Sequence, residues 1–288
     1  MKSTRVDSAP RLITSEGELR ALVAEARRAN QQVGLVPTMG ALHAGHLSLA
    51  EAASRDCQLV IVTIFVNPTQ FGPGEDFSRY PRTLEKDLAL LADRGAQLVF
   101  APATDVMYVA GHATYVEVEG PARRWEGEFR PGHFRGVATI VLKLFNLVQP
   151  DRAYFGQKDF QQALVVRRMI ADFNLPIVLE VCPTVREPDG LALSSRNVYL
   201  SAAERERALA ISRSLQAIKT AHAGGARDAT KLIEQARETL RAAGLQIDYV
   251  AIADRQSLAP LERIDQPAVA LIAARVGTTR LIDNELIG

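Results

Sequence analysis

One segment near the start of the chain limits its fold more than any other. Val33–Val36 is apolar and predicts a buried strand, Pro37–Gly40 predicts a turn, and the apolar periodicity of Leu47–Ala53 predicts a helix. His43 and His46 lie in the connection between strand and helix. The N-terminus of a helix attracts anions through its free N–H groups and its dipole. The segment is therefore typical of a phosphate-binding turn in an α/β fold.

The two histidines have a second interpretation, as surface or capping residues of an ordinary strand–helix turn. Gly40 and Gly45 flank His43, and packing gives no reason for two histidines directly after the first strong strand. Gly45 has no Cβ, so a flat base or ribose can lie directly against the main chain there. We therefore favour a ligand-binding role for His43 and His46.

Strands and helices alternate through the first half of the chain, which predicts a Rossmann-like parallel α/β sheet. Gln58–Val66 is apolar throughout and rich in β-branched residues, as expected of a strand buried on both faces. The other elements predicted here are helices at Ser15–Asn30, Arg82–Arg94, Arg135–Val148 and Phe160–Asp172, strands at Gln97–Phe100, Arg152–Phe155 and Pro176–Cys182, and a candidate strand at Tyr115–Glu119 within the irregular segment Pro102–Gly132.

The composition changes after Pro183, and we place a domain boundary there, between residues 1–182 and residues 183–288. The second part is predicted to be a smaller α+β domain that closes over the first as a lid. Its predicted elements are Ala-, Glu- and Arg-rich helices at Ser201–Thr220 and Asp228–Ala243, followed by short strands at Gln246–Ala253, Val269–Ala274 and Arg280–Asp283.

Polar residues follow most of the predicted strands of the first domain. Ligands of open parallel sheets bind outside the carboxyl ends of the strands, so these residues are expected to converge on one ligand. The clusters are His43 with His46, Asn67 with Gln70, Lys158 with Asp159, and the segment after Cys182.

Two further segments carry groups suited to phosphate. Lys158 stands between a strand and a helix, where its charge suits a triphosphate; a solvated turn lysine is the alternative. Ser194, Ser195 and Arg196 offer hydroxyls and a guanidinium that can each reach a phosphate oxygen. They could instead be a capping cluster. Ser201 fits the N-cap of the next helix better, which leaves these three residues without a structural role and favours the ligand role.

Charge and composition argue against several classes of protein. A formal net charge of +1 gives no reason to expect nucleic acid or an anionic membrane as the main partner. The longest apolar run, Leu59–Val66, is too short to span a bilayer, and Met1–Pro10 lacks the apolar core of a signal peptide. Cys57 and Cys182 are predicted to be reduced core residues without metal-site spacing. We expect a cytoplasmic protein.

Five segments make the interpretation more specific. They are PTMGALHAGH at Pro37–His46, FVNPTQF at Phe65–Phe71, RPGHFRGV at Arg130–Val137, YFGQKD at Tyr154–Asp159 and LSSRN at Leu193–Asn197. In this order the chain resembles the pantoate–β-alanine ligase (pantothenate synthetase) family of the nucleotidyltransferase superfamily. The resemblance runs from about Val33 to the C-terminal strands. Leu193 stands where the superfamily often has methionine.

The resemblance implies a two-step, ATP-dependent ligation in pantothenate and coenzyme A biosynthesis. Pantoate attacks the α-phosphorus of ATP to give pantoyl adenylate and pyrophosphate. The amine of β-alanine then attacks the activated carbonyl and releases pantothenate and AMP. The resemblance also implies a homodimer, with ATP as a substrate that carries Mg²⁺ and no metal held by the protein.

The resemblance assigns roles to individual residues. Catalytic roles fall on His43, His46, Lys158, Ser194, Ser195 and Arg196. ATP would contact these and Met39, Gly40, Ala41, Leu42, Ala44, Gly45, Gly156, Gln157, Asp159, Val185 and Leu193, whereas pantoate would contact Gln70 and Gln162, supported by Asn67. Arg130 and His133 are candidates for the carboxylate of β-alanine or for ordering a loop; an ordinary surface loop is the alternative. No residue is assigned as base for the β-alanine amine.

Two rival functions predict other residues. A transferase acting on a phosphorylated acceptor would need a cationic pocket, whereas the acceptor residues expected here are the neutral Asn67, Gln70 and Gln162. A silent nucleotide-binding module would have little reason to combine the two histidines with Lys158 and Arg196. A tRNA-charging enzyme is disfavoured because no basic anticodon-binding domain is present.

Overall fold

The computed structural model describes residues 9–288, which form two compact units. Unit 1 contains residues up to 122, 126–156 and 161–183, and unit 2 contains residues 123–125, 157–160 and 184–288. The turn that carries Lys158 therefore belongs to unit 2, although unit 1 residues flank it in the sequence. Most of the Met1–Pro10 segment, where no signal peptide is predicted, lies outside the described residues.

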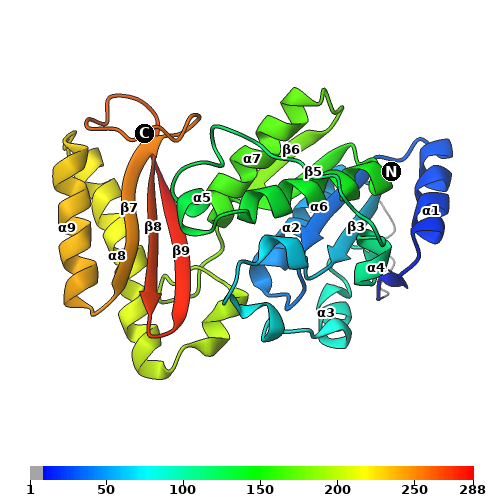
Figure 1. Ribbon diagram of the computed structural model, residues 1–288, viewed down its shortest axis with the longest axis horizontal. Helices are drawn as coiled ribbons and strands as arrows, with labels where there is room; N and C mark the ends of the chain where they lie inside the picture. The colour runs from blue at the N-terminus through cyan, green and yellow to red at the C-terminus, as the bar shows by residue number, and fades with distance from the viewer. Residues whose placement is uncertain (1–8) are drawn as a thin grey trace. The chain divides into compact units, whose positions relative to one another are not determined.

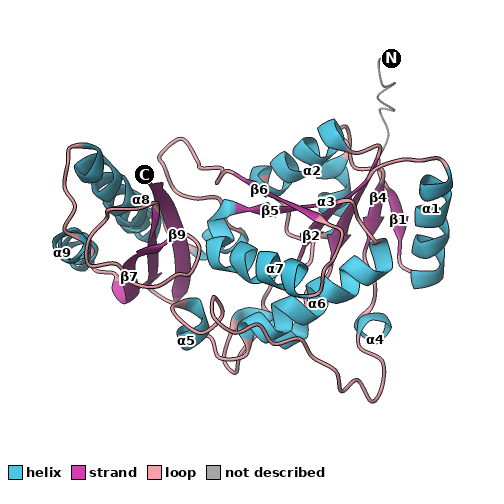
Figure 2. Cartoon of the chain, turned by 90° about the horizontal axis from the view of Figure 1, so that it is seen from above, coloured by secondary structure: helices cyan, strands magenta, loops and turns pink. Residues whose placement is uncertain are grey.

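A six-stranded parallel sheet with the order β1-β4-β3-β2-β5-β6 forms the centre of unit 1 (Figure 2). The order reverses between β2 and β5, the point at which open parallel sheets bind ligands. This confirms the predicted parallel α/β sheet. The strands are β1 Arg11–Ile13, β2 Val33–Thr38, β3 Leu59–Ile64, β4 Leu98–Phe100, β5 Arg152–Gly156 and β6 Val178–Cys182.

Helices cover both faces of this sheet (Figure 2). Alternate residues of a strand point to opposite faces. Leu35 of β2 therefore packs against the first helical layer, and the next residue, Val36, packs against the second. The first layer contains α1 Glu16–Arg28, α6 His133–Val148 and α7 Phe160–Asp172, and the second contains α2 Ala44–Asp56 and α3 Leu84–Leu91.

The candidate strand Tyr115–Glu119 is wrong, because these residues join no sheet. The N–H of Val116 donates instead to the hydroxyl of Thr139 on α6, and Val118 is buried. The alternation in this segment therefore reflects packing of Val116 and Val118 into the core of unit 1 rather than strand pairing. Strand β1 was not predicted, and the irregular segment contains the short helices α4 Thr104–Met107 and α5 Glu126–Phe129.

Unit 2 consists of an antiparallel sheet with two helices packed on it (Figure 1). The order β7-β8-β9 follows the sequence, as predicted for a small α+β unit, and each strand is longer than predicted. Ser201 caps α8 in a capping box with Glu204, which confirms the predicted N-cap. The elements are α8 Ala202–Ala223, α9 Ala229–Ala242, β7 Gln246–Asp254, β8 Ala268–Val276 and β9 Thr279–Ile287.

Both cysteines are free thiols. Cys57 is buried beside the sheet of unit 1, and burial raises the pKa of its thiol; Cys182 is half-buried at the end of β6, and burial raises its pKa too. Helices of sufficient length and apolarity to cross a membrane do not occur among residues 9–288.

Candidate active site

The histidine turn follows β2 directly and ends as the first turn of α2. The prediction placed both histidines in a connection and began the helix at Leu47, but α2 begins at Ala44. His43 is its N-cap: its Nδ1 accepts from the N–H of Gly45 at 3.2 Å. His46 completes a capping box, with its Nδ1 accepting from the N–H of His43 at 3.4 Å. The capping interpretation is therefore correct for both residues.

Capping also determines which nitrogen each imidazole presents to a ligand. Because the Nδ1 atoms of His43 and His46 accept hydrogen bonds, the proton of each neutral ring resides on Nε2. The ring centroids are 4.1 Å apart. The turn thus combines two neighbouring N–H donors with a helix N-terminus, an arrangement that favours a phosphate.

A buried carboxylate that the sequence did not reveal holds the main chain of this turn. Asp87 on α3 is 1% exposed and accepts from the N–H groups of Ala41 (3.0 Å) and Leu42 (2.9 Å). Gly40 and Ala41 both have positive φ, so the turn needs such support. In the sequence, Asp87 is distinguished only by its position four residues before Leu91, on the apolar face of α3.

The second polar segment of unit 1 is the short turn η1, Pro68–Gln70, which follows β3. Asn67 and Gln70 are both buried, and their side-chain amides hydrogen-bond to each other at 3.0 Å. Gln70 Nε2 also lies 3.1 Å from the sulfur of Met39, so a residue predicted to bind pantoate contacts one predicted to bind ATP. Gln162 lies half-buried on α7.

Arg130 and His133 are not ordinary surface residues, so that alternative is wrong. Arg130 forms a bidentate ion pair with Glu75 at 2.7 and 2.8 Å. His133 is 8% exposed, and its Nδ1 lies 2.9 Å from the carbonyl oxygen of Gln70. These contacts attach the loop around Glu75, and the main chain of Gln70, to the start of α6. They match the predicted loop-ordering role.

The charges in this cluster follow from its burial. Desolvation, with a smaller effect of the Arg130 charge, lowers the pKa of His133 to about 4. Burial acts to raise the pKa of Glu75, but hydrogen bonding and charge from Arg130 outweigh it and lower that pKa below its ordinary value. At neutral pH the cluster therefore contains a neutral imidazole and an ion pair.

In unit 2 the turn η3, Gln157–Asp159, carries the predicted lysine. Asn284 on β9 is 1% exposed, and its side chain donates to the carbonyl oxygens of Gln157 (2.9 Å) and Lys158 (2.8 Å). The Gln157 amide donates back to Asn284 Oδ1 at 3.3 Å. A buried amide from the far end of the chain thus fixes the main chain of the lysine turn.

The neighbouring residue on β9 supports the next functional segment. Arg186 donates to both carboxylate oxygens of Asp283, at 2.6 and 3.1 Å, and also to the carbonyl oxygen of Gly190. Burial raises the pKa of Asp283, although Arg186 acts against it. The ion pair thus ties the turn before Leu193 to the strand that holds the lysine turn.

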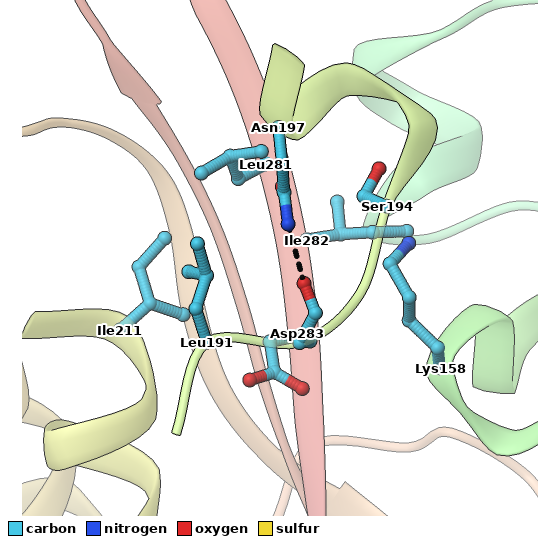
Figure 3. A pocket seen from close by; sticks show the side chains of 9 residues that line it. Lys158, Leu191, Ser194, Asn197, Ile211, Leu281, Ile282 and Asp283 are labelled. Carbon is cyan, nitrogen blue, oxygen red and sulfur yellow. Dashed lines mark hydrogen bonds between the residues drawn. The ribbon is translucent and has the colours of Figure 1, made fainter. Parts of the chain in front are cut away.

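Lys158 and Ser194 line a common pocket in unit 2. Figure 3 shows them on one side of β9, with Leu191 and Ile211 on the other side in this view. Asn197 also lines the pocket, and its Nδ2 donates to the carbonyl oxygen of Ala192 at 3.1 Å (Figure 3). The structure thus brings together the ammonium and hydroxyl groups that the sequence assigned to phosphate. The remaining lining residues are Ala192, Leu281, Ile282 and Asp283.

The expectation that Ser194 has no structural role is wrong. Ser194 is the N-cap of the short helix η4, Ser195–Tyr199, and its hydroxyl accepts from the N–H of Arg196 at 3.2 Å. Ser195 and Arg196 are half-buried within η4. Val185 lies beside Leu193, whose N–H donates to the Val185 carbonyl at 3.0 Å. Val185 and Leu193, which were both predicted to contact ATP, are therefore neighbours in the folded chain.

Among residues 9–288, no group of three or more His, Cys, Asp or Glu side chains could hold a metal ion.

The chain matches the family model described as Pantoate-beta-alanine ligase over residues 11–286. It is 53% identical to the pantothenate synthetase of Moorella thermoacetica, over 96% of this chain and 98% of that protein. It is 55% identical to the pantothenate synthetase of Roseiflexus castenholzii, over 95% of this chain and 98% of that protein.

Solved structures agree with these sequence matches. The pantothenate synthetase of Thermus thermophilus superimposes with a TM-score of 0.91 at 49% identity, covering 96% of this chain and 98% of that chain. The pantoate-beta-alanine ligase of Francisella tularensis, complexed with beta-gamma ATP and β-alanine, gives a TM-score of 0.82 at 33% identity, with the same coverage. The chain belongs to the pantoate–β-alanine ligase family.

Proposed function

We propose that this chain is an enzyme that joins pantoate and β-alanine to form pantothenate, using ATP and releasing AMP and pyrophosphate. A carboxylate oxygen of pantoate attacks the α-phosphorus of ATP, and the bond to pyrophosphate breaks. The amine of β-alanine then attacks the acyl carbon of pantoyl adenylate, AMP leaves with the bonding electrons, and the amine loses a proton. Adenylation supplies the leaving group that a free carboxylate lacks.

One observation carries this proposal: the family relationship extends over nearly the whole chain. The match covers residues 11–286, and the Francisella relative was solved with an ATP compound and β-alanine. The Moorella and Roseiflexus pantothenate synthetases are matched over 98% of their own length. A match of this extent supports the proposal that the chain carries the substrate-binding regions of such an enzyme.

The first step is assigned to the histidine turn and the lysine turn. The Nε2–H groups of His43 and His46 would donate to oxygens of the α-phosphate and of the departing pyrophosphate, at the N-terminus of α2. Lys158, together with Ser194, Ser195 and Arg196, would neutralise the remaining phosphate charge. Mg²⁺ would enter on the nucleotide.

Pantoate is assigned to Gln70 and Gln162, whose amides suit its hydroxyl and carboxylate oxygens. A buried amide discriminates well between substrates, because a ligand that lacks the matching oxygen leaves the amide unpaired. For Arg130 and His133 we favour the loop-ordering role over capture of the β-alanine carboxylate. The charge of Arg130 is already paired with Glu75, and His133 is neutral at pH 7.

Two further features are inferred, the first from the family resemblance and the second from the sequence itself. We infer that the enzyme is a homodimer and that it acts in the cytoplasm. Sedimentation of the purified protein tests the first inference, and fractionation of the source cells tests the second.

The reaction itself can be tested directly. The protein is incubated with ATP, Mg²⁺ and pantoate, with and without β-alanine, while pyrophosphate, AMP and pantothenate are measured. The proposal expects pyrophosphate with pantoate alone, and free AMP and pantothenate only after β-alanine is added. Absence of pyrophosphate in the complete mixture, or AMP release that never depends on β-alanine, would contradict it.

A further inference from the structure

The amide of Asn67 has a hydrogen-bond partner for each of its donor and acceptor positions. Its Oδ1 accepts from the N–H of Thr69 (3.3 Å) and lies within hydrogen-bond distance of the hydroxyls of Thr69 (2.9 Å) and Tyr108 (2.8 Å). Its Nδ2 donates to the carbonyl oxygen of Gly136 (3.1 Å) and to Gln70 Oε1 (3.0 Å). An amide nitrogen carries only two hydrogens, so Asn67 has no donor left for a substrate.

These partners determine which way the amide of Asn67 faces. A main-chain N–H can only donate, so the Asn67 atom that faces the main-chain nitrogen of Thr69 must be oxygen. A main-chain carbonyl can only accept, so the atom that faces the carbonyl oxygen of Gly136 must be nitrogen. Both requirements agree, and neither depends on a group that can exchange donor and acceptor roles.

The orientation of the Gln70 amide follows from that of Asn67. Because Asn67 presents an N–H to it, the Gln70 atom facing Asn67 must be the oxygen. The NH2 group of Gln70 is then turned away from Asn67, toward the sulfur of Met39 at 3.1 Å. A thioether sulfur is a weak acceptor, so an incoming oxygen atom can readily take its place.

We propose that Asn67 and Tyr108 are positioning residues that hold the Gln70 amide with its NH2 group toward pantoate, so that Gln70 acts as a hydrogen-bond donor. This inference rests on the proposed function of the site. It explains why Tyr108, in the irregular segment before α5, is joined to η1 through both Asn67 and Thr69. Substrate oxygens with free lone pairs would be bound at this position, and a substrate N–H would be rejected.

The main chain of Gln70 is held separately. Its carbonyl oxygen lies 2.9 Å from His133 Nδ1 and 3.3 Å from Arg130 Nη2. With the carbonyl held by α6 and the Oε1 atom held by Asn67, the amide cannot turn over without breaking a buried hydrogen bond. Burial also raises the pKa of Tyr108, so its hydroxyl keeps its proton at neutral pH.

The donor role of Gln70 is tested by Gln70→Glu. The ionised carboxylate of this variant still accepts from Asn67 but offers pantoate an anionic acceptor in place of a donor. The KM for pantoate in pyrophosphate release should therefore rise about 100-fold or more at pH 8, and the KM for ATP should change little. Lowering the pH should reduce this defect, because the protonated carboxyl group can donate again. If Gln70 instead presents its oxygen, Gln70→Glu will keep a KM for pantoate near that of the wild type at pH 8.

The positioning role is tested by comparing Asn67→Asp with Asn67→Ala. Aspartate is the closer match in shape, but it has no N–H for Gln70 and would make the Gln70 amide turn over. We expect the KM for pantoate to rise more in Asn67→Asp than in Asn67→Ala. If Asn67 only fills space, the KM for pantoate will rise more in Asn67→Ala than in Asn67→Asp. Thermal unfolding of both variants establishes that folded proteins are being compared.

Tyr108→Phe provides a milder variant that leaves the volume of the side chain intact. It removes one neutral hydrogen bond to Asn67, so the KM for pantoate should rise about threefold to tenfold. Tyr115→Phe, in the same segment but on an exposed ring, is the matched control and should leave this KM unchanged. An unchanged KM in Tyr108→Phe would remove Tyr108 from the proposal.

A wild-type protein without pyrophosphate release would contradict the proposed function itself, whereas active variants with unaltered KM values would contradict only this inference.

Discussion

The side-chain nitrogen of Asn284 donates a hydrogen bond to the carbonyl oxygen of Lys158 at 2.8 Å, although the two residues are 126 positions apart. The same nitrogen donates to the carbonyl oxygen of Gln157 at 2.9 Å. Replacing Asn284 by Ala leaves both carbonyls without this donor and loosens the lysine turn. We expect pyrophosphate release to slow by roughly 10- to 100-fold, since misplacing a reacting group is costly.

The same Asn284→Ala variant should lose about 1–3 kcal/mol of unfolding free energy, measured by urea denaturation, because two partly buried carbonyl groups lose their hydrogen-bond donor. Gln246→Ala on the exposed end of β7 removes another amide of unit 2 and should change neither quantity. A variant that keeps the wild-type rate of pyrophosphate release would show that Lys158 does not need this support.

Asp87→Asn tests the support of the histidine turn. The carboxylate accepts from the N–H groups of Ala41 and Leu42, one with each oxygen. An asparagine turns one of these acceptors into a donor that faces another donor, so the unfolding free energy should fall by about 1–3 kcal/mol. Pyrophosphate release should slow as well, because the turn carries His43. Glu85→Gln, exposed on the same helix, is the control. Equal unfolding free energies and equal rates of pyrophosphate release in the two variants would contradict the supporting role of Asp87.

Gly136→Ala tests how closely η1 packs against α6. A Cβ at this position would lie 2.3 Å from the carbonyl oxygen of Thr69 and 2.7 Å from the Cα of Gln70, both of which belong to the main chain. The turn must move, so we expect a loss of about 1–3 kcal/mol in unfolding free energy and a higher KM for pantoate. Gly17→Ala on α1, whose nearest neighbour is 3.8 Å away, should cause neither effect.

His133 should make folding stability depend on pH. Its pKa is lowered from 6.5 to about 4 in the folded protein, so the unfolded chain binds more protons between these values. Stability is therefore complete above pH 6.5 and falls as the pH drops toward 4, by about 3 kcal/mol from this residue. His133→Asn keeps an N–H donor for Gln70 but has no proton to gain. Urea denaturation at pH 7.5 and pH 5 should give a smaller difference for the variant than for the wild type; equal differences would contradict this.

The elements that the sequence predicted correctly are those with strong local patterns. The apolar run around β3 could only be a strand buried on both faces, and the capping box at Ser201 marks the start of α8. The three-residue strand β1 is too short to show any periodicity, and it pairs with β4, far along the chain. At Tyr115–Glu119 the alternation was present but its cause was different, because Val116 and Val118 pack into the core of unit 1 without joining a sheet.

The supporting residues of the site could not be predicted in the same way. Asp87 and Asn284 are polar residues whose partners lie 45 and 126 positions away, so no local pattern distinguishes them from exposed residues. Asn67 was expected to assist in binding, but only the contacts of its amide indicate that it acts through Gln70. Candidate catalytic and binding residues can be proposed from their residue type and their position after a strand. The residues that orient them can be identified only from contacts made in the folded chain.

His43 is the N-cap of α2 and a candidate catalytic residue, and one substitution can separate these two roles. As the N-cap of α2 it accepts a hydrogen bond from Gly45, and as a candidate catalytic group it presents Nε2–H to phosphate. Asparagine is among the best N-cap residues but has no imidazole. His43→Asn should therefore unfold close to the wild type, while pyrophosphate release falls about 100-fold, as on loss of one preorganised donor.

His43→Ala removes both roles and should lose a further ~1 kcal/mol of unfolding free energy relative to His43→Asn. Ser15→Ala, which removes the N-cap of α1, provides the control for capping alone: it should lose similar stability and keep the wild-type rate. If His43→Asn retained the wild-type rate, His43 would be only a helix cap. The phosphate chemistry assigned to this turn would then depend on His46 and the N–H groups of α2, because these are the donors that such a variant leaves in place.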